Sequence, residues 1–222
     1  VLAPRLWFPD KFGLCRYLAA GLAAVQTVDP RPSIDLQMLA DELDAEALRN
    51  SAGRELFTNP AKTLAARMAG RRVALAGDCA ATLALARHGS SVLLRIAQRL
   101  AAATGLADAA AALRALDAPA SVDALFHDEE IDGPLPERLR VLALTLAAER
   151  TVVAARVAGL DDVDLVAAED VPDLSDGSAG ADGSAGSGRA GASTGAGRVE
   201  QQLAVLAVRL EMAAVYMRLV RG

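Results

Sequence analysis

The sequence is poor in aromatic residues, cysteine and lysine. Phe, Trp and Tyr together make up 3% of the 222 residues, so the core must be built from Ala, Leu and Val. Such a core favours slender helices that pack closely on a Val/Leu sheet. The two cysteines, Cys15 and Cys79, are too few for a disulfide framework and lack CxxC spacing, so each is expected to be a small buried hydrophobe. Only two lysines occur, Lys11 and Lys62.

Features of export, membrane insertion and nucleic-acid binding are also missing. No charged segment is followed by a short apolar core, and no uncharged stretch approaches the ~20 residues of a membrane span. The net charge of -5 argues against a general nucleic-acid binder, which needs clustered Lys and Arg to neutralise phosphates. The sequence therefore predicts a soluble cytoplasmic protein without a nucleic-acid or membrane partner.

Short apolar runs alternate with helical periodicity along most of the chain. Strands are predicted at residues 73–76, 122–126, 139–146 and 163–168. Helices are predicted at residues 12–28, 34–50, 60–70, 80–103 (with a break near 89–91), 106–116, 150–159 and 198–220. This alternation predicts an α/β fold, a three-layer α/β/α sandwich around a parallel sheet with Ala-rich helices on both faces.

Two segments have further distinctive patterns. The predicted helix 34–50 is amphipathic, with its acidic residues, Glu46 among them, expected to face solvent. Its apolar side is expected to bury Ile34, Met38, Leu39, Leu43 and Leu48. Residues 173–197 consist mainly of Gly, Ser, Ala and Asp, a composition that cannot offset its own ordering entropy, so a flexible loop is expected.

Four short segments carry a resemblance to a known family. They are residues 12–20 (FGLCRYLAA), 59–65 (NPAKTLA), 70–77 (GRRVALAG) and 213–219 (AAVYMRL). In these segments the chain resembles the C-terminal sugar isomerase (SIS) half of bacterial and archaeal bifunctional phosphoglucose/phosphomannose isomerases, with actinobacterial TobH-like SIS proteins as the nearest subgroup. The resemblance implies an SIS-like domain over residues 34–222. Residues 1–33 would form a linker helix, which could end an N-terminal SIS half.

The catalytic residues of that family transfer unevenly to this chain. The family takes a glutamate base from the helix after its first strand, but residues 87–98 contain no acid, and no lysine follows Lys62 where the family has one. His127, Glu129 and Glu130 match the family's histidine segment with one extra residue, and they follow the predicted strand 122–126, where open sheets place ligands. Alternatively, His127 is a loop histidine that pairs with Glu129 or Glu130.

Other candidate ligand-binding residues follow the first predicted strand. Asp78 and Thr82 belong to a turn that could present backbone N–H groups to an anion, although the carboxylate of Asp78 favours helix capping instead. Ser90 and Ser91, further along the same helix, complete this candidate ligand-binding set. No second His or Cys stands at metal-ligand spacing from His127, so neither a metal nor another cofactor is expected.

Three functions remain open from the sequence. The favoured one is a phosphosugar-binding protein related to glucose-6-phosphate/mannose-6-phosphate isomerases, with weak or no catalysis. The second is an active aldose–ketose isomerase that takes its missing groups from an N-terminal half or a partner subunit. The third is a purely structural α/β module. The expected partner is a sugar phosphate, and a homodimer is left open.

Overall fold

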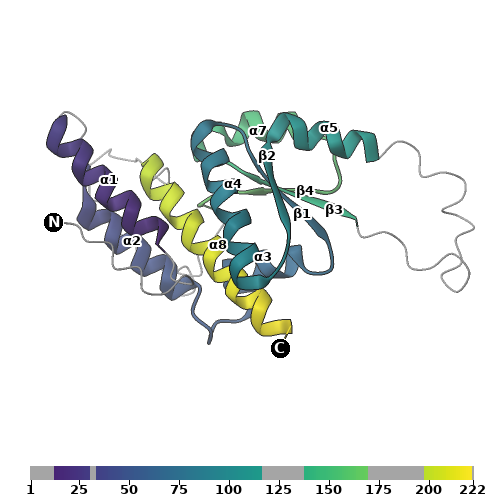
Figure 1. Ribbon diagram of the computed structural model, residues 1–222, viewed down its shortest axis with the longest axis horizontal. Coiled ribbons are helices and arrows are strands. Elements are labelled where there is room, and N and C mark those ends of the chain that lie inside the picture. Colours follow the sequence, from purple (N-terminus) through teal and green to yellow (C-terminus); the bar gives the residue numbers. More distant parts are fainter. Residues whose placement is uncertain (1–12, 31–33, 117–137, 170–197, 222) are drawn as a thin grey trace, which may run out of the picture.

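A parallel sheet between two helical layers forms the centre of the molecule (Figure 1). The computed structural model describes residues 13–30, 34–116, 138–169 and 198–221. Within them the predicted three-layer α/β/α architecture is confirmed. The predicted strand 122–126 and the predicted loop 173–197 lie outside the described residues.

The elements follow one another along the chain as alternating helices and strands. In order they are α1 (Leu14–Val28), α2 (Leu36–Arg49), η1 (Leu56–Thr58), α3 (Pro60–Met68), β1 (Arg72–Gly77), α4 (Ala80–Val92), the π-helical turn η2 (Leu93–Ala97), β2 (Ala101–Gly105), α5 (Leu106–Leu116), β3 (Leu139–Leu144), η4 (Ala147–Glu149), α7 (Arg150–Val157), β4 (Val163–Val166) and α8 (Val199–Arg221).

The sheet has the strand order β2-β1-β3-β4, and each neighbouring pair is parallel. From β1 the chain passes to β2 on one side, and it later returns to place β3 on the other side of β1. The order of strands therefore reverses between β1 and β3. In open α/β sheets, ligands bind at the carboxyl ends of the strands beside such a reversal.

The two faces of the sheet carry side chains of different size. Leu75 and Leu142 pack with α3, α4 and α8 in the larger core, whereas Ala74 and Ala143 pack with α5 and α7 in the smaller one. Because side chains alternate along a strand, each strand contributes to both cores. The near-continuous apolar strands that the sequence shows are thus explained by burial on both faces.

Helix α8 packs on α3 and α4 and also carries α1 and α2 on its outer side, as Figure 1 shows. Its apolar positions are buried along most of its length. None of the helices in the described ranges is long and apolar enough to cross a membrane.

The prediction of a helix over residues 80–103 with a break near residues 89–91 is wrong in two respects. Helix α4 continues through Gly89, Ser90 and Ser91 and gives way to the π-helical turn η2, which ends at Gln98 in the left-handed conformation with φ 53°. Residues 101–105 then form strand β2, paired in register with β1. Alanine favours helix in isolation, so the pairing with β1 overrides the local propensity.

The predicted faces of α2 are also partly wrong. Leu39 is buried as expected, but Leu48 and Met38 are exposed, and Glu46 is fully buried instead of facing solvent. Glu46 is buried because two arginines and an amide bind its carboxylate.

A close approach of backbone to backbone fixes the junction of β1 and α4. A Cβ atom at Gly77 would lie 2.2 Å from the backbone nitrogen of Leu83 and 2.5 Å from its Cα. Neither atom can move without moving the helix. Only glycine therefore allows α4 to start this close to the end of β1.

We expect Gly77→Ala to lower the free energy of unfolding by about 1–3 kcal/mol, because the added methyl group forces α4 away from β1. The measurement is the urea unfolding midpoint at unchanged slope. Gly21→Ala in α1 is the matched control, since a Cβ there meets nothing within 4 Å and alanine favours helix. Equal midpoints for the two variants would contradict the argument.

Candidate functional site

The carboxyl ends of β1 and β3 bring two turns together at the reversal of strand order. The turn after β1 contains Asp78 and Cys79 and leads into α4. The turn after β3 contains Thr145 and Ala147, and the Ala147 N–H donates to Oε1 of Gln202 at 2.8 Å, which ties this turn to α8. The first turn of α4 therefore points its N–H groups towards the edge at which open sheets bind ligands.

Thr82 organises the turn after β1. Its hydroxyl accepts from the backbone N–H groups of Asp78 and Cys79, both at 3.1 Å, and donates to Oδ1 of Asp78 at 2.8 Å. Thr82 is fully buried. These contacts are those of a helix cap. Helix capping is the alternative to anion binding that the sequence favours for this turn, because Asp78 carries a negative charge. The assignment of Asp78 and Thr82 to a ligand stays a prediction.

The other predicted site residues do not join this turn. The Ser90 hydroxyl donates to the carbonyl of Ala101 at 2.6 Å, at the amino end of β2, and Ser91 is exposed beside it on α4. Both serines therefore lie towards the far end of α4 from Asp78 and Thr82. The remaining set, His127 with its two acidic neighbours Glu129 and Glu130, lies outside the described residues.

A cavity of about 220 Å³ adjoins the carboxyl end of the edge strand β4. Its walls include Val166 of β4, Thr63 and Arg67 of α3, Arg209 of α8 and the ring of Phe57. Phe57 is 82% exposed at the rim. Two guanidinium groups on apolar walls suit a small anion with a less polar body, because guanidinium matches the geometry of phosphate and carboxylate.

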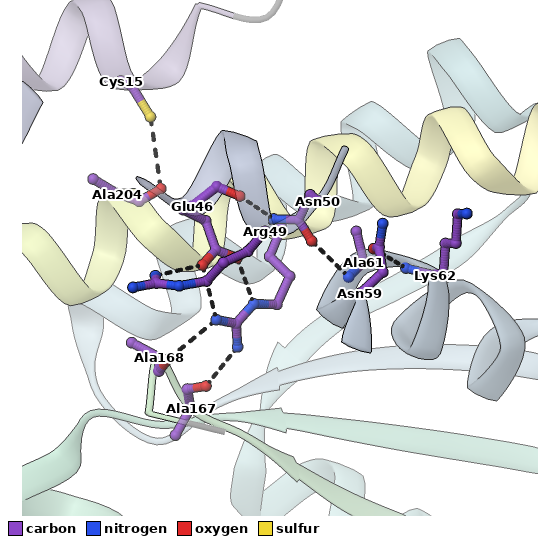
Figure 2. Close-up of polar contacts among 11 residues, drawn as sticks. Cys15, Glu46, Arg49, Asn50, Asn59, Ala61, Lys62, Ala167, Ala168 and Ala204 are labelled. Atoms are coloured by element: carbon purple, nitrogen blue, oxygen red, sulfur yellow. Dashed lines mark hydrogen bonds and ion pairs between the residues drawn. The ribbon is translucent and has the colours of Figure 1, made fainter. Parts of the chain in front are cut away.

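Arg209 is held by a buried network around Glu46. Figure 2 labels other residues of this network, namely Arg49, Asn50, Ala167 and Ala168. The Nε of Arg209 donates to Oε1 of Glu46 at 2.9 Å, and its Nη1 donates to the carbonyl of Ala167 at 2.8 Å. Its Nη2 reaches Oε2 of Glu46 at 3.4 Å and the carbonyl of Ala168 at 3.1 Å. Arg209 thereby connects α2 to the chain immediately after β4. Of its five N–H groups, one on Nη1 has no partner among the described residues.

The charges around the cavity do not cancel. Glu46 also accepts from Nη1 of Arg49 at 3.2 Å, so one carboxylate faces two guanidinium groups. Arg67 is exposed and forms no hydrogen bond or ion pair with any residue that the structure describes. Its positive charge is therefore left over on the wall of the cavity.

Two asparagines fix the start of α3 beside this network. Asn59 caps the helix, as the sequence predicts, with Oδ1 accepting from the N–H of Lys62 at 2.9 Å. Oδ1 of Asn50 accepts from the N–H of Ala61 at 2.8 Å, while its Nδ2 donates to Oε1 of Glu46 at the same distance. The Tyr216 hydroxyl of α8 donates to the carbonyl of Asn50 at 2.6 Å. The helix that presents Arg67 is therefore tied to both α2 and α8.

A second buried acid lies between α4 and α8. Glu211 pairs with His88, Nε2 to Oε1 at 2.8 Å, and both side chains are largely buried. The Sγ of Cys15 contacts the carbonyl of Ala204 at 3.7 Å on the same helix. Burial, with a smaller contribution from the charge of Glu211, raises the pKa of Cys15 to about 12. Cys15 is thus a protonated, half-buried side chain that attaches α1 to α8, close to the role expected of it.

Sequence reasoning missed the two arginines of the cavity. An exposed arginine in the last turn of a short helix, like Arg67, is commonplace. A signal did exist for Arg209 and Glu211, since both interrupt an otherwise apolar helix and buried charges need partners. In the described ranges, no three residues of the types His, Cys, Asp and Glu are grouped closely enough to hold a metal ion.

We expect Arg209→Met to lower the free energy of unfolding by about 3–5 kcal/mol, because it removes the main partner of a fully buried carboxylate. Adding Glu46→Gln should recover part of this loss, since the double variant no longer buries an unmatched charge. Chemical denaturation of the unaltered chain, the single variant and the double variant measures the free energy of unfolding of each. Arg87→Met is the control, because Arg87 is exposed on α4 and has no partner within the described ranges. A loss no larger than that of the control would contradict the role of the pair.

Comparison with known proteins identifies a similar fold. No protein-family model and no curated protein matches the chain. Among solved structures, the chain is similar to a glucose-6-phosphate isomerase like protein from Thermus thermophilus, with a TM-score of 0.55 and 20% sequence identity. The match covers 95% of this chain and 56% of that protein, so the chain spans little more than half of its length. The similarity shows that the chain has a phosphoglucose isomerase-like fold.

Proposed function

We propose that the chain binds a phosphorylated sugar at the carboxyl edge of its sheet and isomerises it weakly or not at all. It would be a relative of the C-terminal SIS half of glucose-6-phosphate/mannose-6-phosphate isomerases, nearest to the TobH-like subgroup. The observation that carries the proposal is the cavity beside β4, which has Arg67 and Arg209 among its lining residues. The fold shared with a glucose-6-phosphate isomerase like protein supports the choice of a sugar phosphate.

The chemistry of the cavity supports binding through the phosphate group. Arg67 has no partner among the described residues to occupy its donors, and Arg209 keeps one N–H on Nη1. Because the network around Glu46 holds Arg209 in place, binding would cost little side-chain entropy there. The rim ring of Phe57 offers an apolar face to the sugar. The Thr63 hydroxyl donates to the carbonyl of Leu56 at 2.7 Å and can still accept from a sugar hydroxyl.

We propose weak or absent catalysis because the helical segment that supplies the general base in the similar family has no carboxylate in this chain. Moving a proton between C1 and C2 of a sugar needs a positioned carboxylate or a comparable group. The helical segment 87–98 contains no acid, and Asp78 at the carboxyl edge is bound by the hydroxyl of Thr82. Losing a general base typically costs about 10²–10⁴ in rate.

One observation favours an active isomerase as the second candidate. The chain covers only 56% of the similar Thermus protein, so catalytic groups could come from a further half or a partner subunit. His127, with Glu129 and Glu130, would then remain the catalytic contribution of this chain. A homodimer could bring two such sites together.

We expect millimolar fructose 6-phosphate or glucose 6-phosphate to raise the melting temperature, because a ligand that binds only the folded state stabilises it. Unphosphorylated glucose should have no such effect. Arg67→Gln should remove most of the shift and leave the unliganded melting temperature unchanged, since Arg67 has no partner among the described residues. Arg114→Gln is the matched control, an exposed arginine in the last turn of α5.

A coupled assay of isomerisation on the same preparations separates the candidates. Turnover that persists through purification and is lost in His127→Ala would establish the active isomerase. Ligand stabilisation without turnover supports the binding protein. If no sugar phosphate raises the melting temperature, the remaining candidate function is the purely structural α/β module.

A further inference from the structure

A groove opens between α3 and the last turns of α8, on the side of the sheet where the amino ends of the strands lie. Its volume is about 470 Å³, within the range of small-molecule sites. Gly70 and Arg99 line it, and they precede β1 and β2 respectively, so the groove lies beside the amino ends of these strands. The phosphosugar cavity described above adjoins the carboxyl end of β4 instead.

Helix α3 lines both the cavity beside β4 and the groove, with opposite faces of the helix. Thr63 and Arg67 of α3 line the cavity beside β4, whereas Ala66 and Ala69 line the groove. Together with Pro60 and Leu64, the first pair follows the i, i+3, i+4, i+7 spacing of one helix face, and Lys62 and Ala65 complete the same spacing for the second pair. The two sets are offset by two residues, about 200° around the helix axis, so they belong to opposite sides of α3. The groove is therefore a separate site and not an extension of the first one.

The walls of the groove are mostly apolar and partly open to solvent. Ala66 and Ala69 leave room above α3, and Met217 and Val220 of α8 face them across the groove. Val220 is 86% exposed. Apolar walls of this kind favour an apolar ligand body.

Lys62 contributes a cation that is already fixed in position. Its Nζ donates to the carbonyls of Ala52 at 2.8 Å and Arg54 at 2.6 Å, and it lies 5.3 Å from the centre of the Tyr216 ring. An ammonium group has three N–H donors, so one remains for a ligand. A cation held by three neighbours loses little side-chain entropy when it binds.

Arg99 contributes a second cation through an unusual piece of backbone. The π-helical turn η2 and the left-handed Gln98, with φ 53°, come immediately before it. Left-handed backbone is costly for a residue other than glycine and often marks a functional site. Arg99 Nη2 donates to the carbonyl of Arg71 at 3.3 Å, which leaves most of its donors for other partners. Among the residues that the structure describes, no acidic side chain lines the groove.

We propose that this groove binds a small amphipathic anion, a molecule with an apolar body and one carboxylate, sulfonate or phosphate. Lys62 and Arg99 bind the anionic group, and the apolar body lies against Ala66, Ala69 and Val220. Two cations without an acid beside them in the described part of the chain select the charge, and the volume sets the size. This site goes beyond the phosphosugar site and does not depend on it.

The test uses anilinonaphthalene sulfonate, a fluorescent apolar dye with a single sulfonate. The dye should bind the folded chain saturably at one site, with an increase in its fluorescence. Monomeric decanoate should displace it, because it presents a carboxylate on an apolar chain. Decyltrimethylammonium, with the same chain and the opposite charge, should displace it at least tenfold less well, a ratio worth about 1.4 kcal/mol.

Three variants and a control locate the site. Lys62→Gln and Arg99→Gln should each weaken dye binding about tenfold, as expected for the loss of a charge-assisted contact. Ala66→Trp should abolish binding by filling the groove from an exposed position on α3. Arg156→Gln, an exposed arginine in the last turn of α7 on the other face of the sheet, should bind as the unaltered chain does.

Thermal melting followed by circular dichroism shows which variants are folded. Dye binding is compared only among variants that melt cooperatively. Loss of binding in Ala66→Trp and in either cation variant, with cooperative melting retained, supports the proposal. Equal displacement by the cationic and anionic detergents overturns it, as does full binding in Ala66→Trp or an absence of saturable binding to the folded chain. Fructose 6-phosphate binding is measured separately, so failure of one site does not imply failure of the other.

Discussion

A single buried carboxylate, that of Glu46, connects the helical layer to the sheet. It binds the Arg209 guanidinium of α8, which in turn binds the carbonyls of Ala167 and Ala168 after β4. It also accepts from Asn50, whose side chain binds the start of α3. Burying such a pair costs several kcal/mol of desolvation per ion, which only good geometry and further hydrogen bonds offset. The positions of α2, α3, α8 and the edge of the sheet are therefore interdependent.

The strands that the sequence predicts correctly are those with the least local ambiguity. β1, β3 and β4 are short segments rich in Val, Leu and Ala, a composition that is typical of buried parallel strands. β2 offers no such signal, because Ala101, Ala102 and Ala103 continue the Ala-rich composition of α4. Its strand conformation comes from pairing with β1, after Gln98 ends the helix. Contacts between distant residues decide this segment, and no local pattern records them.

The candidate site was less predictable than the fold for a related reason. The capping role of Asn59 follows from its own neighbours, Pro60 in particular, so the sequence predicts it. Arg67 and Arg209 become one cavity wall only when α3 and α8 pack together. Glu46 looked like one more acid on a solvent-facing helix, and only its partner on α8 explains its burial. Spacing within one helix contains no information about a partner that is 163 residues away.

The burial of Cys15 has a practical consequence for thiol chemistry. Reagents and oxidants attack the thiolate, and a pKa raised to about 12 by burial keeps the Cys15 thiol protonated at pH 8. Alkylation or oxidation of this residue in the folded chain is correspondingly slow. Cys79, half-buried where β1 turns into α4, is the other cysteine of the sequence. A spectroscopic label attached to Cys79 would report from the junction of β1 and α4 and leave the attachment of α1 undisturbed.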